Sequence, residues 1–165
     1  MIKPELIIFK TANVDAIVNK IKSLNETLTP IQARLNSLQL STLNELSQTL
    51  KSSSPSISTV MLESVESIAI NWPIESRFPG LDLLRLIALY NDLDYIKIIE
   101  NSILTKNEID MNIGLRILCN LCFRDNGKRN VCDGIHSLLK IVGDSQSAKI
   151  QGSLVSLMSK YFLVI

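Results

Sequence analysis

The sequence has little of what a catalytic or metal-dependent site needs. It contains one histidine, His136, three cysteines and six glycines among 165 residues. No glycine-rich phosphate loop is present, and nothing in the sequence supplies an orienting third group or an oxyanion site to a pair formed by His136 and a cysteine. We therefore expect no enzyme activity, no catalytic residue and no cofactor.

Long apolar runs and an excess of one charge are also missing. No uninterrupted apolar stretch reaches the roughly 18 residues that a membrane span needs. Seventeen basic and sixteen acidic residues give a net charge of +1, without the electrostatic footprint of a general nucleic-acid binder. An odd number of cysteines and no secretory signal favour a reduced cytoplasmic or nuclear location. Neither a membrane nor a nucleic acid is an expected partner.

Helical periodicity fills the chain instead. Hydrophobic residues make up 46% of the sequence, and no hairpin turn signal or strand pair interrupts their spacing. A polar loop at residues 52–56 is too short to be a domain linker. The sequence therefore predicts an all-α fold in a single domain over residues 1–165.

Capping signals predict several helix ends. Asn13 is the expected N-cap of the first helix. A capping box with proline at the first helical position, at 29–32, predicts the start of the second, with a restart near Thr42. Another capping box at 105–108 predicts a later start. The pair at 126–127, Asn-Gly, is expected to close a helix because both residues tolerate positive φ.

The stretch at residues 72–89, WPIESRFPGLDLLRLIAL, is expected to organise the core. Pro79 suits the first turn of a helix after a non-helical corner. Leucine and isoleucine then surround the helix axis almost completely, which is typical of a helix buried among others. Trp72 and Leu84 are expected in the core, together with Leu118 and Leu138. Arg85 interrupts the apolar run and is expected to pair with Asp82, three residues before it.

The helices resemble one another. The leucine pair at 81 and 84 recurs at 115 and 118 and again at 154 and 157, at offsets of 34 (115 minus 81) and 39 (154 minus 115) residues. These offsets lie near the roughly 40-residue period of armadillo and HEAT arrays. They predict an armadillo-like right-handed superhelix of short helix pairs or triples, whose inner groove binds extended peptides. The apolar end at 161–165 has no capping repeat, so we expect the domain to be truncated or to lack its C-terminal repeats.

Four residues invite a metal interpretation, Cys119, Cys122, Cys132 and His136, because they supply four soft ligands in number. Cys119 and Cys122 lie on the core face of their helix, where cysteine behaves as a small hydrophobe. A redox pair would need a thiolate at a helix N-terminus, whereas this CxxC lies in mid-helix. We therefore expect no bound metal and no disulfide.

The arginines are the more informative polar residues. Arg77 has no acidic neighbour nearer in the sequence than Glu75, and we expect it to lie outside the packed stripe. Arg116, Arg124 and the basic pair at 128–129 form a second set around the turn at 126. Either a solvated basic face or an anion-binding groove would account for this set.

Three segments together carry a family resemblance: WPIESRFPGLDLLRL at 72–86, IIFKTANVDAIVNKI at 7–21 and NIGLRILCNLCF at 112–123. They resemble the PUL domain, found at the C-terminus of the phospholipase A-2-activating protein family and of its yeast ubiquitin-pathway relatives. The resemblance extends from about Pro4 to Ile150. It implies an armadillo-like fold, and the domain is longer in family members than in this chain. It also implies one of two kinds of parent protein, between which the sequence does not decide. One carries a WD-repeat propeller with a ubiquitin-binding module, and the other is a thiol-peptidase-like and thioredoxin-like chain.

The resemblance also implies an adaptor function. PUL domains bind the acidic, aromatic-containing C-terminal tail of the hexameric AAA ATPase valosin-containing protein in a basic concave groove, and so serve ubiquitin-dependent degradation. Ubiquitin would be reached through other domains of a longer chain. The alternative is a structural scaffold that docks other domains of its own chain.

The peptide-binding residues implied in this way are Arg77, Arg116, Asn120, Arg124 and Arg85. Arg77 is the first candidate, since guanidinium groups make bidentate bonds to carboxylates. Asn120 falls at the position that hydrogen-bonds the ligand main chain in peptide-binding armadillo proteins. Arg116 occupies the place where those proteins usually carry tryptophan, which departs from their binding mode.

Overall fold

The computed structural model describes residues 8–162, apart from the side chains at 125, 128, 130, 132, 133, 135 and 160–162. Every regular element within this range is helical, which confirms the all-α prediction. None of the helices in the described range has the length and hydropathy that crossing a membrane requires.

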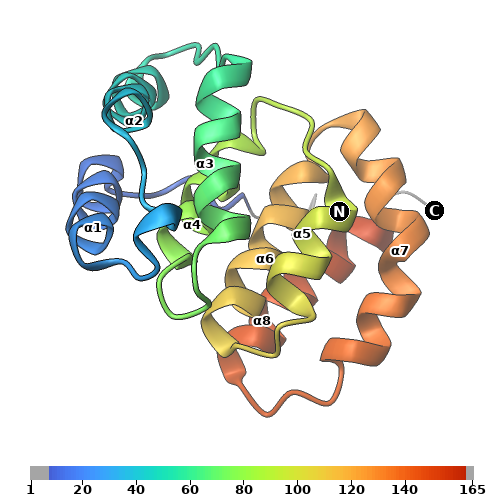
Figure 1. Cartoon of the computed structure of the whole chain (residues 1–165). Coiled ribbons are helices and arrows are strands. Elements are labelled where there is room, and N and C mark those ends of the chain that lie inside the picture. The colour runs from blue at the N-terminus through green and yellow to red at the C-terminus, as the bar shows by residue number, and fades with distance from the viewer. Residues whose placement is uncertain (1–7, 163–165) are drawn as a thin grey trace.

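Four successive helix pairs build the fold (Figure 1). In chain order the elements are α1 (Val14–Thr27), the 3-10 turn η1 (Ile31–Ala33), α2 (Ser37–Lys51), α3 (Thr59–Asn71), α4 (Phe78–Ile87), α5 (Tyr95–Ile98) continuing into the π-helical η2 (Ile99–Ile103), α6 (Glu108–Leu121), α7 (Asp125–Val142) and α8 (Ala148–Phe162).

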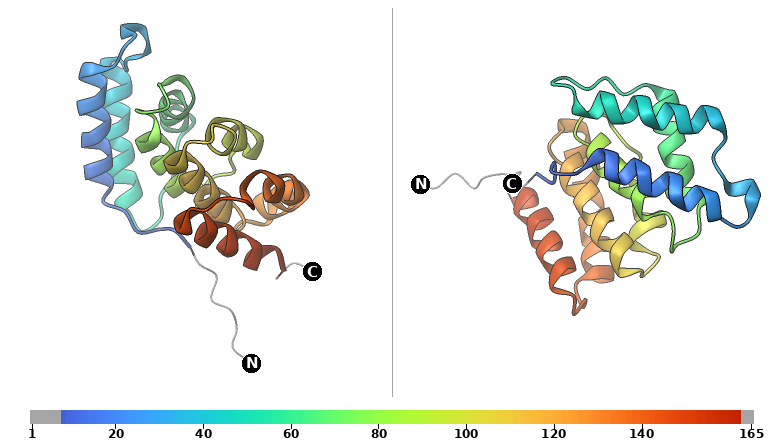
Figure 2. Two further views of the ribbon diagram at one scale, coloured as in Figure 1. Left: turned by 90° about the horizontal axis from the view of Figure 1, so that it is seen from below. Right: turned by 90° about the vertical axis from the view of Figure 1, so that its left-hand side faces the viewer.

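The helices form two layers. Helix α4 packs between α1 and α6, and α6 packs between α4 and α8, so α1, α4, α6 and α8 form the inner layer. The outer layer holds α2, which packs on α3, and α5, which packs on α7. The pairs follow one another across the molecule in chain order (Figure 2). This arrangement is compatible with an armadillo-like helical solenoid.

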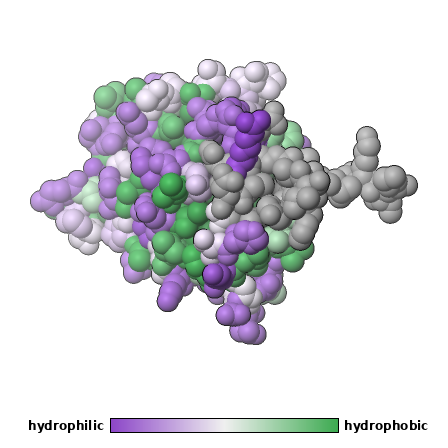
Figure 3. Space-filling view, turned by 90° about the vertical axis from the view of Figure 1, so that its right-hand side faces the viewer, coloured by the Kyte–Doolittle hydropathy of each residue, from purple (hydrophilic) through white to green (hydrophobic). Residues whose placement is uncertain are grey.

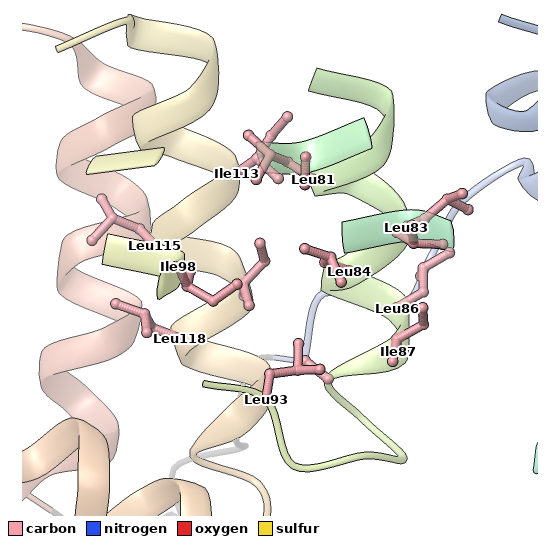
Figure 4. Close-up of a cluster of buried hydrophobic side chains, with 14 of the residues drawn as sticks. Leu81, Leu83, Leu84, Leu86, Ile87, Leu93, Ile98, Ile113, Leu115 and Leu118 are labelled. Carbon is pink, nitrogen blue, oxygen red and sulfur yellow. The ribbon is translucent and has the colours of Figure 1, made fainter. Parts of the chain in front are cut away.

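Helix α4 is buried almost all round, as its sequence predicts. Leu81 and Leu84 point towards α6, whereas Leu83 and Leu86 point to the opposite side of the helix (Figure 4). Each of these side chains is at most 5% exposed. Because an inner helix of the stack has neighbours on several sides, a helix without a polar face is stable there.

The repeated leucines occupy equivalent places in three inner helices. The pairs at 81 and 84 in α4, 115 and 118 in α6, and 154 and 157 in α8 are all buried. Trp72 and Leu138, the other expected core residues, are 2% and 1% exposed. Trp72 also donates a hydrogen bond from Nε1 to the carbonyl of Ala33, 2.9 Å away, which ties the corner before α4 to the turn before α2.

Two glycines allow neighbouring helices to approach closely. A Cβ on Gly80 of α4 would lie 2.7 Å from Cγ2 of Ile68 on α3. A Cβ on Gly114 of α6 would lie 2.1 Å from Oγ of Ser102 in η2. Since real Cβ atoms do not come so near to other heavy atoms, glycine at these positions sets the spacing between the two layers.

The predicted start of the second helix at 29–32 is wrong. Helix α2 begins at Ser37, because Asn36 and Gln39 form a reciprocal capping box just before it. Residues 31–33 make only the short turn η1. Ile31 and Leu38 are exposed, at 67% and 72%. Helix α2 then continues to Lys51 without the expected restart at Thr42.

Two further predicted helix ends are corrected, whereas Asn13 is confirmed as the N-cap of α1. The N-cap of α6 is Asn107, whose Oδ1 accepts hydrogen bonds from two backbone amides, and not the predicted box at 105–108. The pair at 126–127 does not close a helix: it lies in the first turn of α7, and no described glycine has a positive φ. A Cβ on Gly127 would meet the carbonyl oxygen of Leu121 at 2.3 Å, so this glycine serves a close approach.

The surface is mixed where Figure 3 views it. Hydrophobic and hydrophilic side chains alternate over this face of the molecule. Single exposed apolar residues on such a surface are ordinary for a folded protein. They do not by themselves mark a binding site.

Candidate peptide-binding groove

An extended N-terminal segment lies across the inner layer before α1 begins. We call residues 8–12 the arm (Figure 2). The backbone N–H of Phe9 donates to Oδ1 of Asn120 on α6 at 2.9 Å, and Nδ2 of Asn120 donates back to the carbonyl of Phe9 at 3.1 Å. The Arg85 guanidinium donates to the same carbonyl and to that of Thr11. The inner layer thus holds an extended main chain by its backbone groups.

Asn120 is completely buried and uses its whole amide group. Besides its two bonds with Phe9, its Nδ2 donates to the carbonyl of Arg85 at 2.7 Å. An asparagine amide has two N–H donors and one carbonyl, and all of them have partners here. The residue that the resemblance assigns to the main chain of a ligand therefore binds a main chain, and that chain is the protein's own arm.

The aromatic ring of the arm is held by a cation. The guanidinium carbon of Arg116 lies 4.9 Å from the centre of the Phe9 ring, within the range of a cation–π interaction. Nε of Arg116 also lies 3.4 Å from Oγ of Ser153, which in turn donates to Oδ1 of Asn112 at 2.8 Å. Arg116 is half-buried. It connects the arm on one side with α8 on the other.

Arg85 is buried and pairs with Asp82, as the sequence predicts. Its Nε donates to Oδ1 of Asp82 at 2.7 Å, and its side chain is 6% exposed. Because its two terminal nitrogens donate to the arm, the whole guanidinium is used inside the protein. Arg85, Arg116 and Asn120 therefore come together around one residue, Phe9.

The structure contradicts the expectation that Arg77 lies outside the packed stripe. Its side chain is only 7% exposed and forms an ion pair with Asp110 of α6, which is 1% exposed, at 3.0 Å between Nε and Oδ2. The other carboxylate oxygen, Oδ1, has no hydrogen-bond partner among the described residues. Burial raises the pKa of Asp110, and the nearby Arg77 offsets part of this rise. Arg77 thus joins the start of α4 to the first turn of α6.

Arg124 lies at the surface. Its Nε donates to Oδ1 of Asp92 and its Nη1 to the carbonyl of Tyr90, both at 2.8 Å. The hydrogen bond from Arg124 lowers the pKa of Asp92. Arg124 and Asp92 border an open hollow of about 420 Å³, which Asn126 and the 53% exposed Phe123 also line. An arginine beside exposed aromatic side chains is a common composition of protein interfaces.

Four of the residues in this region were missed from the sequence: Phe9, Tyr90, Asp92 and Phe123. None of them belongs to an apolar stripe of helical spacing. Phe9, Tyr90 and Phe123 are aromatic residues in short non-helical segments next to helix ends, and this placement could have marked them as candidate site residues. The side chain of Lys128, expected in the same basic set, lies outside the described side chains.

The cysteine positions agree with the hydrophobic interpretation of two of them. Cys119 and Cys122 are 0% and 8% exposed, and Sγ of Cys119 lies 3.7 Å from the carbonyl of Ser153. His136 is exposed, and the side chain of Cys132 lies outside the described ones. Over the described residues, no group of three or more histidine, cysteine or acidic side chains is placed to hold a metal ion. That the protein binds no metal stays a prediction.

Comparison with known proteins agrees with the resemblance that the sequence carries. Residues 3–162 match the family model of the PUL domain. The ubiquitin homeostasis protein lub1 of Schizosaccharomyces pombe is 32% identical over 90 residues, which are 53% of this chain and 12% of that protein. The chain therefore spans only a small part of this much longer relative. Since the family model covers nearly the whole sequence, the chain belongs to the PUL domain family.

Proposed function

We propose that this domain is a non-catalytic adaptor that binds the acidic C-terminal tail of an AAA ATPase of the valosin-containing type. It would serve ubiquitin-dependent protein degradation in the cytoplasm or nucleus. Membership of the PUL family supports an interaction domain, and the name of the fission-yeast relative supports the ubiquitin pathway. The observation that carries the proposal is the extended arm on the inner layer, held at Phe9 by Asn120 and Arg85.

The arm changes where a partner peptide would lie. Because Asn120 and Arg85 already bond the arm, a second main chain would run beside the arm and not in its place. Of the five predicted site residues, Arg116 and Arg124 are the two left near the surface to meet it. A guanidinium makes bidentate, charge-assisted hydrogen bonds to carboxylates, so these two arginines suit an acidic tail.

The five predicted site residues then divide by role. Arg116 and Arg124 would contact the partner. Arg77, Arg85 and Asn120 would act as positioning residues: Arg77 fixes α4 against α6, and the other two fix the arm. Tyr90 and Phe123, which are 40% and 53% exposed, would supply apolar contacts beside Arg124.

The proposal is tested by titrating a labelled acidic tail peptide into the domain and following fluorescence anisotropy. Arg124→Glu should weaken binding about 10- to 100-fold, since hydrogen bonds to charged groups contribute about 1.5–3 kcal/mol. Affinity should fall further as salt rises, because exposed charges are screened within roughly 10 Å at 0.1 M ionic strength. The matched control is Lys140→Glu, the same charge change at an exposed position on α7.

Three measurements decide this test. A circular dichroism spectrum and a melting curve must show that Arg124→Glu is folded, since this variant loses the pair with Asp92. Undiminished affinity in the folded variant would remove Arg124 from the site. An equal loss in Lys140→Glu would mean that net charge alone drives the interaction.

A scaffold that docks other domains of its own chain is the second candidate. Two exposed apolar residues favour it: Ile31 of η1, at 67%, and Leu38 of α2, at 72%. Replacing both by serine should leave tail binding intact but should weaken docking to the rest of a longer chain, measured by co-purification of separately expressed parts. Unchanged docking would count against the scaffold.

A further inference from the structure

A small pocket opens where the arm leaves the inner layer and turns into α1. It has a volume of about 270 Å³ and is lined by the arm together with the C-terminal ends of α2 and α4. A dry cavity of about 150 Å³ holds benzene, and pockets for drug-sized ligands begin near 300 Å³. The pocket therefore has room for one large side chain and little more.

Three leucines lie in the lining of the pocket. Leu86 is 5% exposed and belongs to the hydrophobic core, and Leu50 and Leu89 are half-buried beside it. An apolar or aromatic side chain placed against Leu50 and Leu89 would remove their remaining exposed surface, and its own, from water. Such a side chain is the group that this part of the lining favours.

The rim of the pocket is cationic. Lys10 of the arm is exposed and forms no ion pair with any described residue, so its ammonium is available. Lys51 also lines the pocket, but Asp15 neutralises it at 2.6 Å. No acidic side chain is among the described residues of the lining. A ligand that carries one negative charge next to its apolar group is therefore complementary to the pocket.

The pocket adjoins the surface of Arg124. Tyr90 lines the pocket, and its carbonyl accepts the hydrogen bond from Nη1 of Arg124. Arg124 itself lines the hollow beside Phe123. An extended ligand could therefore occupy the pocket with its last residue while the residues before it pass Arg124.

We infer that this pocket receives the C-terminal residue of an acidic peptide: the apolar side chain lies on Leu50, Leu86 and Leu89, and the terminal carboxylate pairs with Nζ of Lys10. The inference rests on the proposed function and specifies where the last residue of the tail binds. In this arrangement the free carboxylate and the last side chain of the peptide determine specificity. Arg124 contacts the acidic residues that precede them.

The first test compares three versions of the tail peptide: a free C-terminal carboxylate, a C-terminal amide, and a last apolar residue changed to alanine. The native domain should prefer the free carboxylate by about five-fold, a modest factor because Lys10 is exposed. Lys10→Ala should bind acid and amide alike, and the control Lys20→Ala, at an exposed position on α1, should keep the preference. If the native domain binds the acid and the amide equally well, the pocket assignment is overturned while tail binding stands.

The second test does not depend on the tail. N-acetyl-tryptophan combines one aromatic side chain with one carboxylate, and its titration into the domain is followed by nuclear magnetic resonance. The methyl signals of Leu50, Leu86 and Leu89 should shift, and Ala12→Leu, which fills the pocket from the arm, should abolish the shifts. If these shifts occur but no tail peptide binds, the pocket stands and the proposed partner fails. Absent shifts, or the same shifts in Ala12→Leu, would overturn the pocket.

Discussion

Replacing Arg77 by methionine should destabilise the fold strongly. The guanidinium and the carboxylate of Asp110 lie 3.0 Å apart, with side chains 7% and 1% exposed. Methionine fills much of the space of the arginine stem but leaves the Asp110 carboxylate without the one side-chain partner that it has among the described residues. Breaking a buried pair from one side costs about 3–5 kcal/mol. At roughly 2–4 °C per kcal/mol for a chain of this size, the melting temperature should fall by about 6–20 °C.

The reasoning is checked by urea unfolding of a double-mutant cycle. Asp110→Leu should cost about as much as Arg77→Met, because it leaves a buried guanidinium unpaired. The double variant should recover most of the loss, since an apolar pair of similar volume is often neutral or stabilising by about 1–4 kcal/mol. The two single effects should therefore be far from additive.

The pH dependence of the free energy of unfolding provides an independent test of the same ion pair. Because burial raises the pKa of Asp110 in the folded state above the ordinary value of 3.8, the folded protein binds this proton more tightly than the unfolded chain does. The contribution of Asp110 to the free energy of unfolding therefore increases as the pH falls through the raised pKa towards 3.8. Asp15 and Asp92, whose pKa values are lowered, act in the opposite direction, so the effect of Asp110 is read as the difference between the wild type and the double variant.

Two results would refute this account of Arg77. One is a free energy of unfolding for Arg77→Met within about 0.5 kcal/mol of the wild type, the range of ordinary surface substitutions. The other is a double variant as unstable as the sum of both singles, which would mean that the side chains act separately. The first result would restore Arg77 as a surface residue available to a ligand.

Three further perturbations follow from single contacts. Leu84→Ala should cost about 2–5 kcal/mol in urea unfolding, because the side chain is 2% exposed in the core; a loss below 1 kcal/mol, well under this range, would contradict its burial. Gly114→Ala should lower the free energy of unfolding by about 1–3 kcal/mol, because its Cβ would lie 2.1 Å from Oγ of Ser102. A melting temperature equal to that of the wild type would show that η2 moves away from the new methyl group without cost. Asn120→Ala should speed hydrogen exchange at the Phe9 amide about ten-fold or more, since it removes a hydrogen-bond partner whose loss costs about 1–3 kcal/mol; unchanged exchange would mean that Asn120 does not hold the arm.

Local sequence determined the helices and the faces that they bury. The periodicity of about 3.6 residues reports which side of a helix is apolar, so the leucines of α4 and their counterparts in α6 and α8 could be assigned to the core. The bond between Arg85 and Asp82 was predictable because residues three apart on a helix are neighbours. Helix starts were less predictable, since several residues near 30 and 105 are suitable caps and packing selects one of them.

Only the tertiary structure decided which polar groups meet across the fold. Arg77 pairs with a carboxylate 33 residues away, and Asn120 with a backbone 111 residues away. The sequence around Asp110 does not indicate that it pairs with Arg77, and the sequence around Phe9 does not indicate that it pairs with Asn120. Sequence spacing fixes contacts within one helix, because the helix has one geometry. Contacts between helices depend instead on how several apolar faces pack together. The burial of Arg77 and the binding of the arm by Asn120 could therefore be seen only in the tertiary structure.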